Sequence, residues 1–116
     1  MARPTFDITL TWLVAQLVLE LDDITTVSGL ASRPNTTIEM LRTHALHLKA
    51  LNNRCASYQQ LIQKLSESIQ TGIETQQIGQ ATKTLTTLSD AIGTVMGKVQ
   101  VEVSRRENAA VHVHKD

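Results

Sequence analysis

Two pairs of histidines are the side chains best placed for metal chemistry in this 116-residue chain. His44 and His47 stand about one helical turn apart, a spacing that lets two imidazoles share one metal ion. No Cys, Asp or Glu stands beside them at ligand spacing, and His44 falls within an apolar repeat. We therefore expect packed histidines and no metal site. His112 and His114 lie in a polar C-terminal segment and are also expected to bind no metal.

Arrangements typical of catalysis are absent from the sequence. It contains no Gly-rich phosphate loop, no His-Glu-x-x-His motif, no paired cysteines and no set of Ser, His and Asp on varied elements. The single cysteine, Cys55, falls in the same apolar repeat as His44, and we interpret it as a small core residue. The sequence therefore predicts a binding protein that is not an enzyme and has no cofactor.

A basic stripe is the best candidate for a binding surface. On a helical wheel of 100° per residue, five polar side chains between positions 42 and 64 fall within about 60° of one another, and Arg54 flanks them. An ordinary solvated helix face has the same pattern. As a binding surface it suits duplex RNA, because cations meet phosphates, amides meet sugar hydroxyls, and no aromatic platform is present for stacking unpaired bases. The predicted RNA-binding residues are Arg42, Lys49, Asn53, Arg54, Gln60 and Lys64.

The formal net charge is zero, but the charges are distributed unevenly. Residues 1–30 are mainly acidic, whereas residues 33–64 carry Lys and Arg with Glu39 as the one acid. A neutral total therefore does not exclude a polyanionic partner, because the local face determines the local field.

Three helical stretches must position these residues. Hydrophobic residues make up 41% of the chain and aromatic residues only 3%, so the core must be aliphatic. The first stretch begins near Asp7 or Thr9 and ends near Ser28 and Gly29. Its apolar residues fall on almost every side, which predicts burial on most faces. The run 10–19 is too short to cross a bilayer and is followed by acids without a cleavage site, so we expect a cytoplasmic protein without membrane contact.

The second stretch has the clearest pattern. After Pro34, either Asn35 or Thr36 can cap a helix that continues to Thr71 and Gly72. Apolar positions then alternate in steps of three and four over four heptads, as in a coiled coil. We predict that this seam binds a second copy or a helical partner; its residues are Leu41, His44, Leu48, Leu51, Cys55, Tyr58, Ile62, Leu65 and Ile69.

The third stretch repeats the heptad pattern from Ile78 to Val99, with weaker helix formers between the apolar positions. A second helix of about 35 residues would be roughly 50 Å long, too long for one shorter helix to cover. We therefore predict an all-α fold, an elongated bundle of three helices per chain that forms a homodimer. Residues 1–104 form the single domain and 105–116 a polar flexible tail.

This layout resembles the alphanodavirus suppressor of RNA silencing. The shared features are a short first helix, Pro34 and Asn35 opening a long second helix with Leu41 in its first turns, a polar and basic outer face, and a further helical segment with a polar tail. The resemblance covers residues 8–70. It implies a dimeric helical protein that binds double-stranded RNA without reading its sequence and shields that RNA from silencing in the host cytoplasm. The alternative is a helical assembly factor or secretion chaperone that binds a partner protein through its coiled-coil seams.

Overall fold

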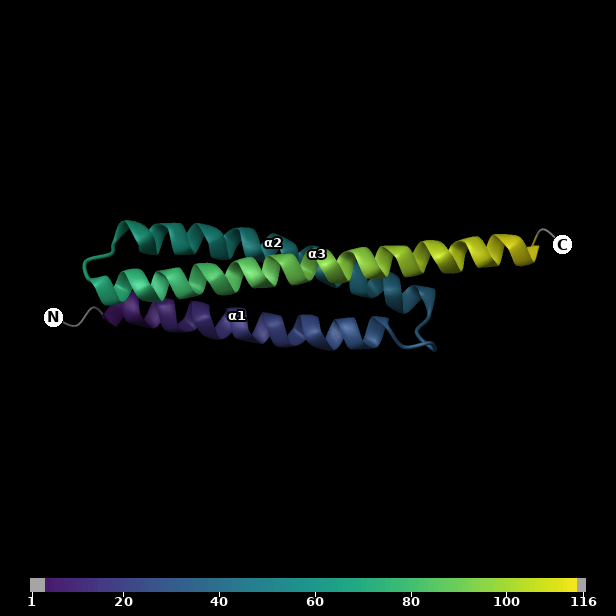
Figure 1. The fold of residues 1–116 in the computed structure, drawn as a ribbon, viewed down its shortest axis with the longest axis horizontal. Coiled ribbons are helices and arrows are strands. Elements are labelled where there is room, and N and C mark those ends of the chain that lie inside the picture. Colours follow the sequence, from purple (N-terminus) through teal and green to yellow (C-terminus); the bar gives the residue numbers. More distant parts are fainter. Residues whose placement is uncertain (1–3, 115–116) are drawn as a thin grey trace.

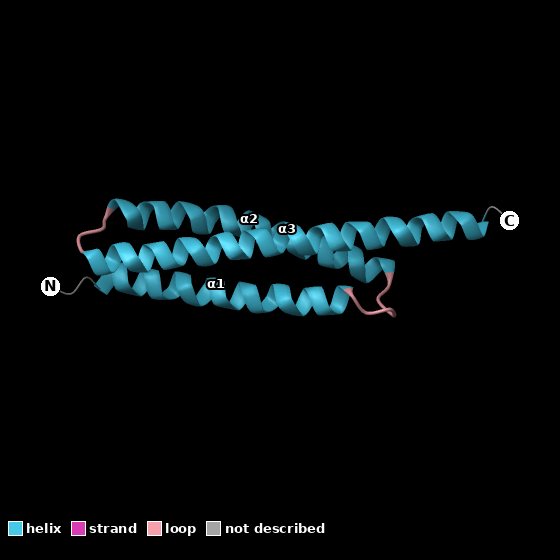
Figure 2. Ribbon diagram, in the orientation of Figure 1, coloured by secondary structure: helices cyan, strands magenta, loops and turns pink. Residues whose placement is uncertain are grey.

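Three helices run up, down and up in an elongated bundle (Figure 1). The computed structural model describes residues 4–114, with side chains for 5–109, and measures 74 × 20 × 17 Å. The helices are α1 (Pro4–Ala31), α2 (Ile38–Glu67) and α3 (Gly72–His114). Short loops join them at opposite ends of the bundle, and the described residues contain no strand (Figure 2). The predicted all-α, elongated three-helix bundle is confirmed.

The two loops set where the helices begin and end. Thr37 caps α2, because its side-chain oxygen accepts a hydrogen bond from the Met40 amide at 3.1 Å. At the second loop Thr71 accepts a bond from the Glu74 amide at 3.1 Å, while Glu74 accepts one from the Gln70 amide at 2.8 Å. Thr71 and Glu74 thus have the Thr-x-x-Glu pattern of a capping box at the start of α3, with the second bond made by the Gln70 amide instead of the Thr71 amide. The prediction that α2 ends at Thr71 and Gly72 is therefore wrong, since these residues open the next helix.

The core is one aliphatic cluster to which all three helices contribute. The seam predicted on α2 is buried, with Leu41, Leu48 and Leu51 fully covered, and the α3 repeat from Ile78 to Val99 packs into the same cluster. The seam is thus covered within one chain by α1 and α3. The length of the seam therefore does not require a second copy, because α3 is 43 residues long and supplies the missing cover.

Two seam positions differ from the prediction. His44 is only half-buried, and Ile69 lies beyond the end of α2 in the loop, where it packs against the edge of the core. The helical repeat therefore ends at Leu65, because Ser68 closes α2 with its amide bonded to the Leu65 carbonyl at 3.1 Å.

The first helix is buried on one side only, so the prediction of burial on most faces is wrong. Leu13 and Leu17 are fully covered, whereas Trp12, Val18 and Leu19 are exposed. In a bundle of three helices each helix contacts the other two along one side only, so only that side is buried. The apolar residues on the other side of α1 are left at the surface.

The third helix extends past the other two at its C-terminal end (Figure 1). It continues to His114, so α3 occupies most of the segment 105–116 that was predicted to be a flexible tail. The side chains of His112 and His114 lie outside the described residues. None of the described helices has a stretch apolar and long enough to cross a membrane.

Candidate nucleic-acid interface

The outer surface of α2 carries the predicted basic stripe. Arg42, Lys49, Asn53, Gln60 and Lys64 are all exposed, and they extend over about 33 Å of one helix. They hold this alignment because the opposite side of α2 is fixed in the core, which prevents the helix from rotating. The structure therefore leaves this side of α2 accessible to a ligand.

Lys49 and Lys64 are the cations on this surface whose positive charge no described acidic side chain neutralises in an ion pair. Within the described part of the chain neither side chain makes an ion pair. Asn53 lies between them in sequence, and Gln60 stands one turn before Lys64. Two free ammonium groups and two amides can together meet phosphates and hydroxyl groups of one ligand.

Arg42 is exposed but not free. Its Nη2 donates to Glu107 Oε1 of α3 at 2.6 Å, and 59% of the Arg42 side chain remains accessible. An exposed pair of this kind contributes at most about 1 kcal/mol, so a phosphate can replace the carboxylate. Glu107 nevertheless lowers the positive potential at this end of the stripe.

Arg54 lies on a different side of α2, facing α1. Its Nε and Nη2 donate to the two carboxylate oxygens of Glu20 at 2.8 and 3.3 Å, and the Tyr58 hydroxyl donates to Glu20 Oε2 at 3.3 Å. The hydrogen bond to Glu20 raises the pKa of Arg54, against the opposing effect of its burial. Burial and the Glu20 charge raise the pKa of Tyr58. Arg54 therefore connects α1 to α2 and is not part of the exposed stripe.

The basic residues at the C-terminal end of α3 are also partly compensated. Arg105 and Arg106 both donate to Glu102, with shortest distances of 2.6 and 2.8 Å. The hydrogen bond from Arg105, followed by that from Arg106, lowers the pKa of Glu102 to about 2. The two arginines share one carboxylate, so this cluster keeps one net positive charge.

His44 and His47 do not lie together in a group of metal-ligating side chains. His47 pairs through Nε2 with Asp23 of α1, and His44 has a buried Nε2 without a hydrogen-bond partner. Among the described residues no group of three or more His, Cys, Asp and Glu side chains could hold a metal ion. Both histidines lie at the junction of the helices rather than around a common centre.

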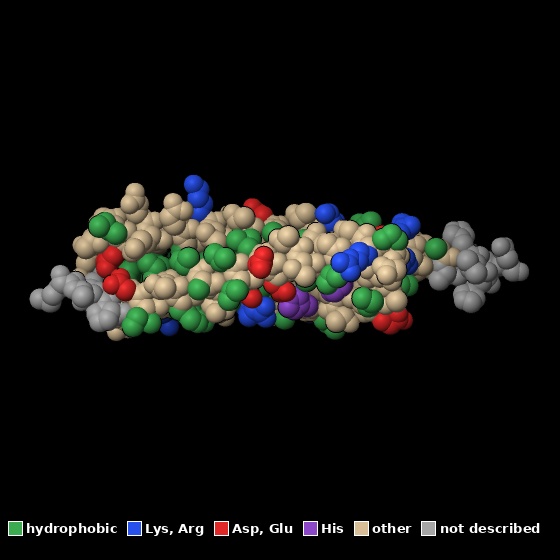
Figure 3. Space-filling view, turned by 90° about the horizontal axis from the view of Figure 1, so that it is seen from below, with side chains coloured by type: hydrophobic (Ala, Val, Ile, Leu, Met, Phe, Trp, Pro, Cys, Tyr) green, Lys and Arg blue, Asp and Glu red, His purple; other side chains and the backbone are tan. Residues whose placement is uncertain are grey.

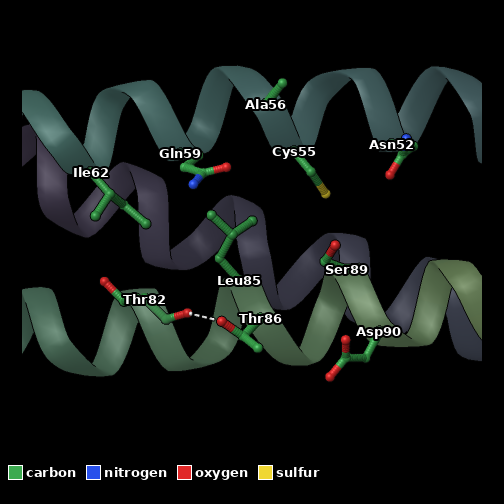
Figure 4. Close-up of a pocket in the computed structure, with 10 residues that line it drawn as sticks. All are labelled: Asn52, Cys55, Ala56, Gln59, Ile62, Thr82, Leu85, Thr86, Ser89 and Asp90. Carbon is green, nitrogen blue, oxygen red and sulfur yellow. Dashed lines mark hydrogen bonds between the residues drawn. The ribbon is translucent and has the colours of Figure 1, made fainter.

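Cys55 lies in the floor of a groove between α2 and α3 (Figure 4). The groove has a volume of about 390 Å³, and its rim carries Asn52, Gln59, Ser89 and Asp90. Burial raises the pKa of the Cys55 thiol, which therefore stays protonated and weakly nucleophilic at neutral pH. The groove has no cation for a phosphate and no group that could act as a catalytic base beside the thiol, apart from Asp90 at its edge.

Sequence reasoning missed the partner acids and the free surface of α1. Glu20 and Asp23 lie 34 and 24 residues before their partners on α2, and Glu107 lies 65 residues after Arg42, so no local pattern links them. The exposed side of α1 had a signal in the sequence, because apolar residues on every side of a helix exceed what one chain of three helices can bury.

No family model matches this chain, and no curated protein or solved structure matches it either.

Proposed function

We propose that this chain binds duplex RNA along the outer face of α2, without reading the base sequence. The observation that carries the proposal is the exposed alignment of Lys49 and Lys64 with Asn53 and Gln60 on one unbroken helix. Lysine ammonium groups would contact phosphates, while the amides would bond 2′-hydroxyls in the shallow minor groove of an A-form duplex.

A duplex fits this surface better than a single strand does. Binding of unpaired bases uses exposed aromatic rings for stacking, and the outer face of α2 has none. Tyr58 is buried on the inward side of α2, and Trp12 lies on α1. The resemblance to the alphanodavirus suppressor adds a consequence of binding, which is that covered RNA is shielded from the silencing machinery of the host cytoplasm.

Arg42 would join the contact by exchanging Glu107 for a phosphate. Both side chains of this pair are about half accessible, so solvent screens their attraction in the free protein. A phosphate brings more negative charge than one carboxylate, and the exchange would release a counterion from the RNA. The resulting site would contain three cations in one row.

Fluorescence anisotropy with labelled RNA duplexes of about 20 base pairs tests the proposal. Duplexes of unrelated sequence should bind with equal affinity, and the affinity should fall steeply as salt rises. Replacing both lysines, Lys49→Ala with Lys64→Ala, should weaken binding at least about tenfold and reduce the salt slope by about 2. Unchanged affinity in this double variant would exclude the stripe.

Two further variants separate this face from general electrostatics. Lys98→Ala removes an exposed charge from α3 near the end of α1 and should leave the affinity unchanged. Glu107→Gln removes the competitor of Arg42 and should strengthen binding about two- to tenfold. If Lys98→Ala weakens binding as much as a single stripe lysine does, the interaction is not localised on α2.

A protein partner is the second candidate, and the exposed apolar side of α1 favours it. The heptad seams predicted to hold a partner helix are filled by helices of the same chain, so a partner there would have to displace α1 or α3. The apolar surface that remains accessible is the outer side of α1. A function in protein assembly would therefore use α1 and not the heptad seams.

A further inference from the structure

Residues 8–19 of α1 expose a group of large apolar side chains, which we call the α1 patch. Its five large side chains are 39% to 69% accessible. They are Ile8, Trp12, Val14, Val18 and Leu19. Figure 3 views the bundle from the α1 side, where hydrophobic side chains lie in separate groups among polar ones along the face, including its left half. Single exposed hydrophobic residues are ordinary, but five large ones within twelve residues of one helix are a candidate interaction surface.

We propose that the α1 patch binds a second copy of this chain, with the two α1 helices packed antiparallel. The α1 patch is separate from the outer face of α2, so this pairing does not rest on RNA binding. Self-association differs from the dimer predicted on the α2 seam, because that seam is filled within the chain.

The spacing of the residues along α1 supports an antiparallel pair. The centre of the patch follows positions 8, 12, 15 and 19, which are separated by four, three and four residues. This spacing reads the same in both directions, so two copies related by a twofold axis bring Ile8 opposite Leu19 of the other copy. Trp12 then lies opposite Ala15, and a large side chain meets a small one at each central layer.

The acidic residues at the two ends of the patch do not select an orientation. In a parallel pair Asp7 would lie level with its equivalent, and Asp22 with its own. In the antiparallel pair Asp7 of one copy lies within about 3 Å, along the helix axis, of Asp22 of the other copy. The antiparallel arrangement is favoured by the two helix dipoles, which it opposes.

Trp12 is fixed in position before any partner binds. Its ring packs edge-on against Tyr58 of α2, with centroids 6.4 Å apart and an angle of 64° between the rings, while half of the side chain stays accessible. A rigid aromatic side chain loses little entropy on binding. A neighbouring groove of about 290 Å³ between α1 and the start of α3, lined in part by Leu10 and Val14, widens the apolar surface.

The total surface of the chain is consistent with pairing. A compact monomer of 12.8 kDa has about 6,300 Å² of accessible surface, whereas this chain has 7801 Å². The excess arises because the bundle is long and thin, with a radius of gyration of 18.9 Å. A standard interface covers about 800 Å² on each partner, so packing two bundles side by side through α1 would remove about half of the excess.

Light scattering and the fluorescence of Trp12 test the proposal directly. At high concentration the scattering particle should have twice the mass of one chain, which is 12.8 kDa. Trp12 is the only tryptophan, so its emission should shift to the red on dilution as the ring becomes more exposed. A single-chain mass at all concentrations, with constant emission, would overturn the proposal whether or not the chain binds RNA.

Charge substitutions at the paired positions test the orientation. Ile8→Lys alone and Leu19→Glu alone should each raise the dissociation constant of the dimer at least about tenfold. The double variant Ile8→Lys with Leu19→Glu should restore the dimer, because each lysine then faces a glutamate of the other copy. Failure of the double variant to associate would overturn the antiparallel register.

Leu46→Glu is the matched control. Leu46 is 70% exposed on α2, so this variant makes the same kind of change outside the α1 patch and should remain dimeric. Circular dichroism of all variants should show the same helicity, since each site is on the surface. If Leu46→Glu dissociates the dimer as strongly as Leu19→Glu does, the α1 patch is not the interface.

Discussion

The first two helices are similar in length and both bury one side, yet their outer faces differ in kind. The outer face of α1 carries Trp12, Val18 and Leu19, whereas that of α2 carries Lys49, Asn53 and Lys64. Leu46 and Met40 are the two large apolar side chains exposed on α2, whereas α1 exposes five. One outer face suits an apolar partner, and the other suits a polyanion.

The residues of the core and the residues proposed to bind a partner therefore lie on opposite sides of the same helices. The inner sides of α1 and α2 have similar composition, because both contribute mainly aliphatic residues to one core. Only the outer sides distinguish the helices. Substitutions on the inner sides should therefore affect stability, and substitutions on the outer sides should affect binding.

Shortening one core leucine on each helix should have the largest effect. Leu13 of α1 and Leu48 of α2 are both fully buried, so Leu13→Ala and Leu48→Ala should each lower the free energy of unfolding by about 2–5 kcal/mol. Urea denaturation measures both values. Leu46→Ala, at a position that is 70% exposed, should change stability by less than about 0.5 kcal/mol. A small loss for Leu13→Ala beside a large loss for Leu48→Ala would show that α1 is not part of the common core.

A smaller effect is expected at the polar contact that joins the two helices. Glu20 is largely covered and accepts hydrogen bonds from Arg54 and Tyr58, so Glu20→Gln should cost about 1–2 kcal/mol. Urea denaturation gives the stability, and absorbance of the tyrosinate should show that the pKa of Tyr58 falls toward its ordinary value while burial keeps it raised. Glu107→Gln, in an exposed pair, is the control and should cost less than about 1 kcal/mol. Equal losses at Glu20 and Glu107 would contradict a special link between α1 and α2.

The sequence was sufficient to predict the inner sides of α2 and α3. A strict alternation of three and four residues, as at Leu41, Leu48 and Leu51, allows only one helical stripe to face a core. The number of helices and the absence of strands among the described residues follow from the same pattern. On α1 the pattern could not show the buried side, because apolar residues on every side leave its rotation undetermined until the other helices are placed.

The candidate site was predictable only in part, for a similar reason. The helical wheel places Lys49 and Lys64 on one face correctly, because a wheel depends on local geometry alone. It cannot reveal that Arg54 turns toward Glu20 or that Arg42 meets Glu107, since these acids belong to other helices. The Thr71 and Glu74 capping box was a local signal that the sequence does contain, and it was missed because Gly72 suggested a helix end.

The smallest expected effect is a loss of stability in alkaline solution. Two titrating groups cause it, one on the side of α2 that faces α1 and one on the side that faces α3. Tyr58 faces α1 and Cys55 faces the groove beside α3. Burial raises the pKa of each above its ordinary value, 10.0 for the hydroxyl and 9.0 for the thiol. The folded chain therefore binds these protons more tightly than the unfolded chain, so stability should be complete below pH 9 and should fall as the pH rises through the raised values.

Denaturation at a series of pH values separates the two contributions. Cys55→Ala removes the part that begins near pH 9, and Tyr58→Phe removes the part that begins near pH 10 while retaining the ring beside Trp12. Tyr58 is the only tyrosine, so tyrosinate absorbance reports its titration without overlap. Because Glu20 contributes to the raised pKa of both groups, Glu20→Gln should reduce the alkaline loss on both flanks. An effect of Glu20→Gln on the Tyr58 titration alone would show that the α3 flank of α2 is electrostatically independent of α1.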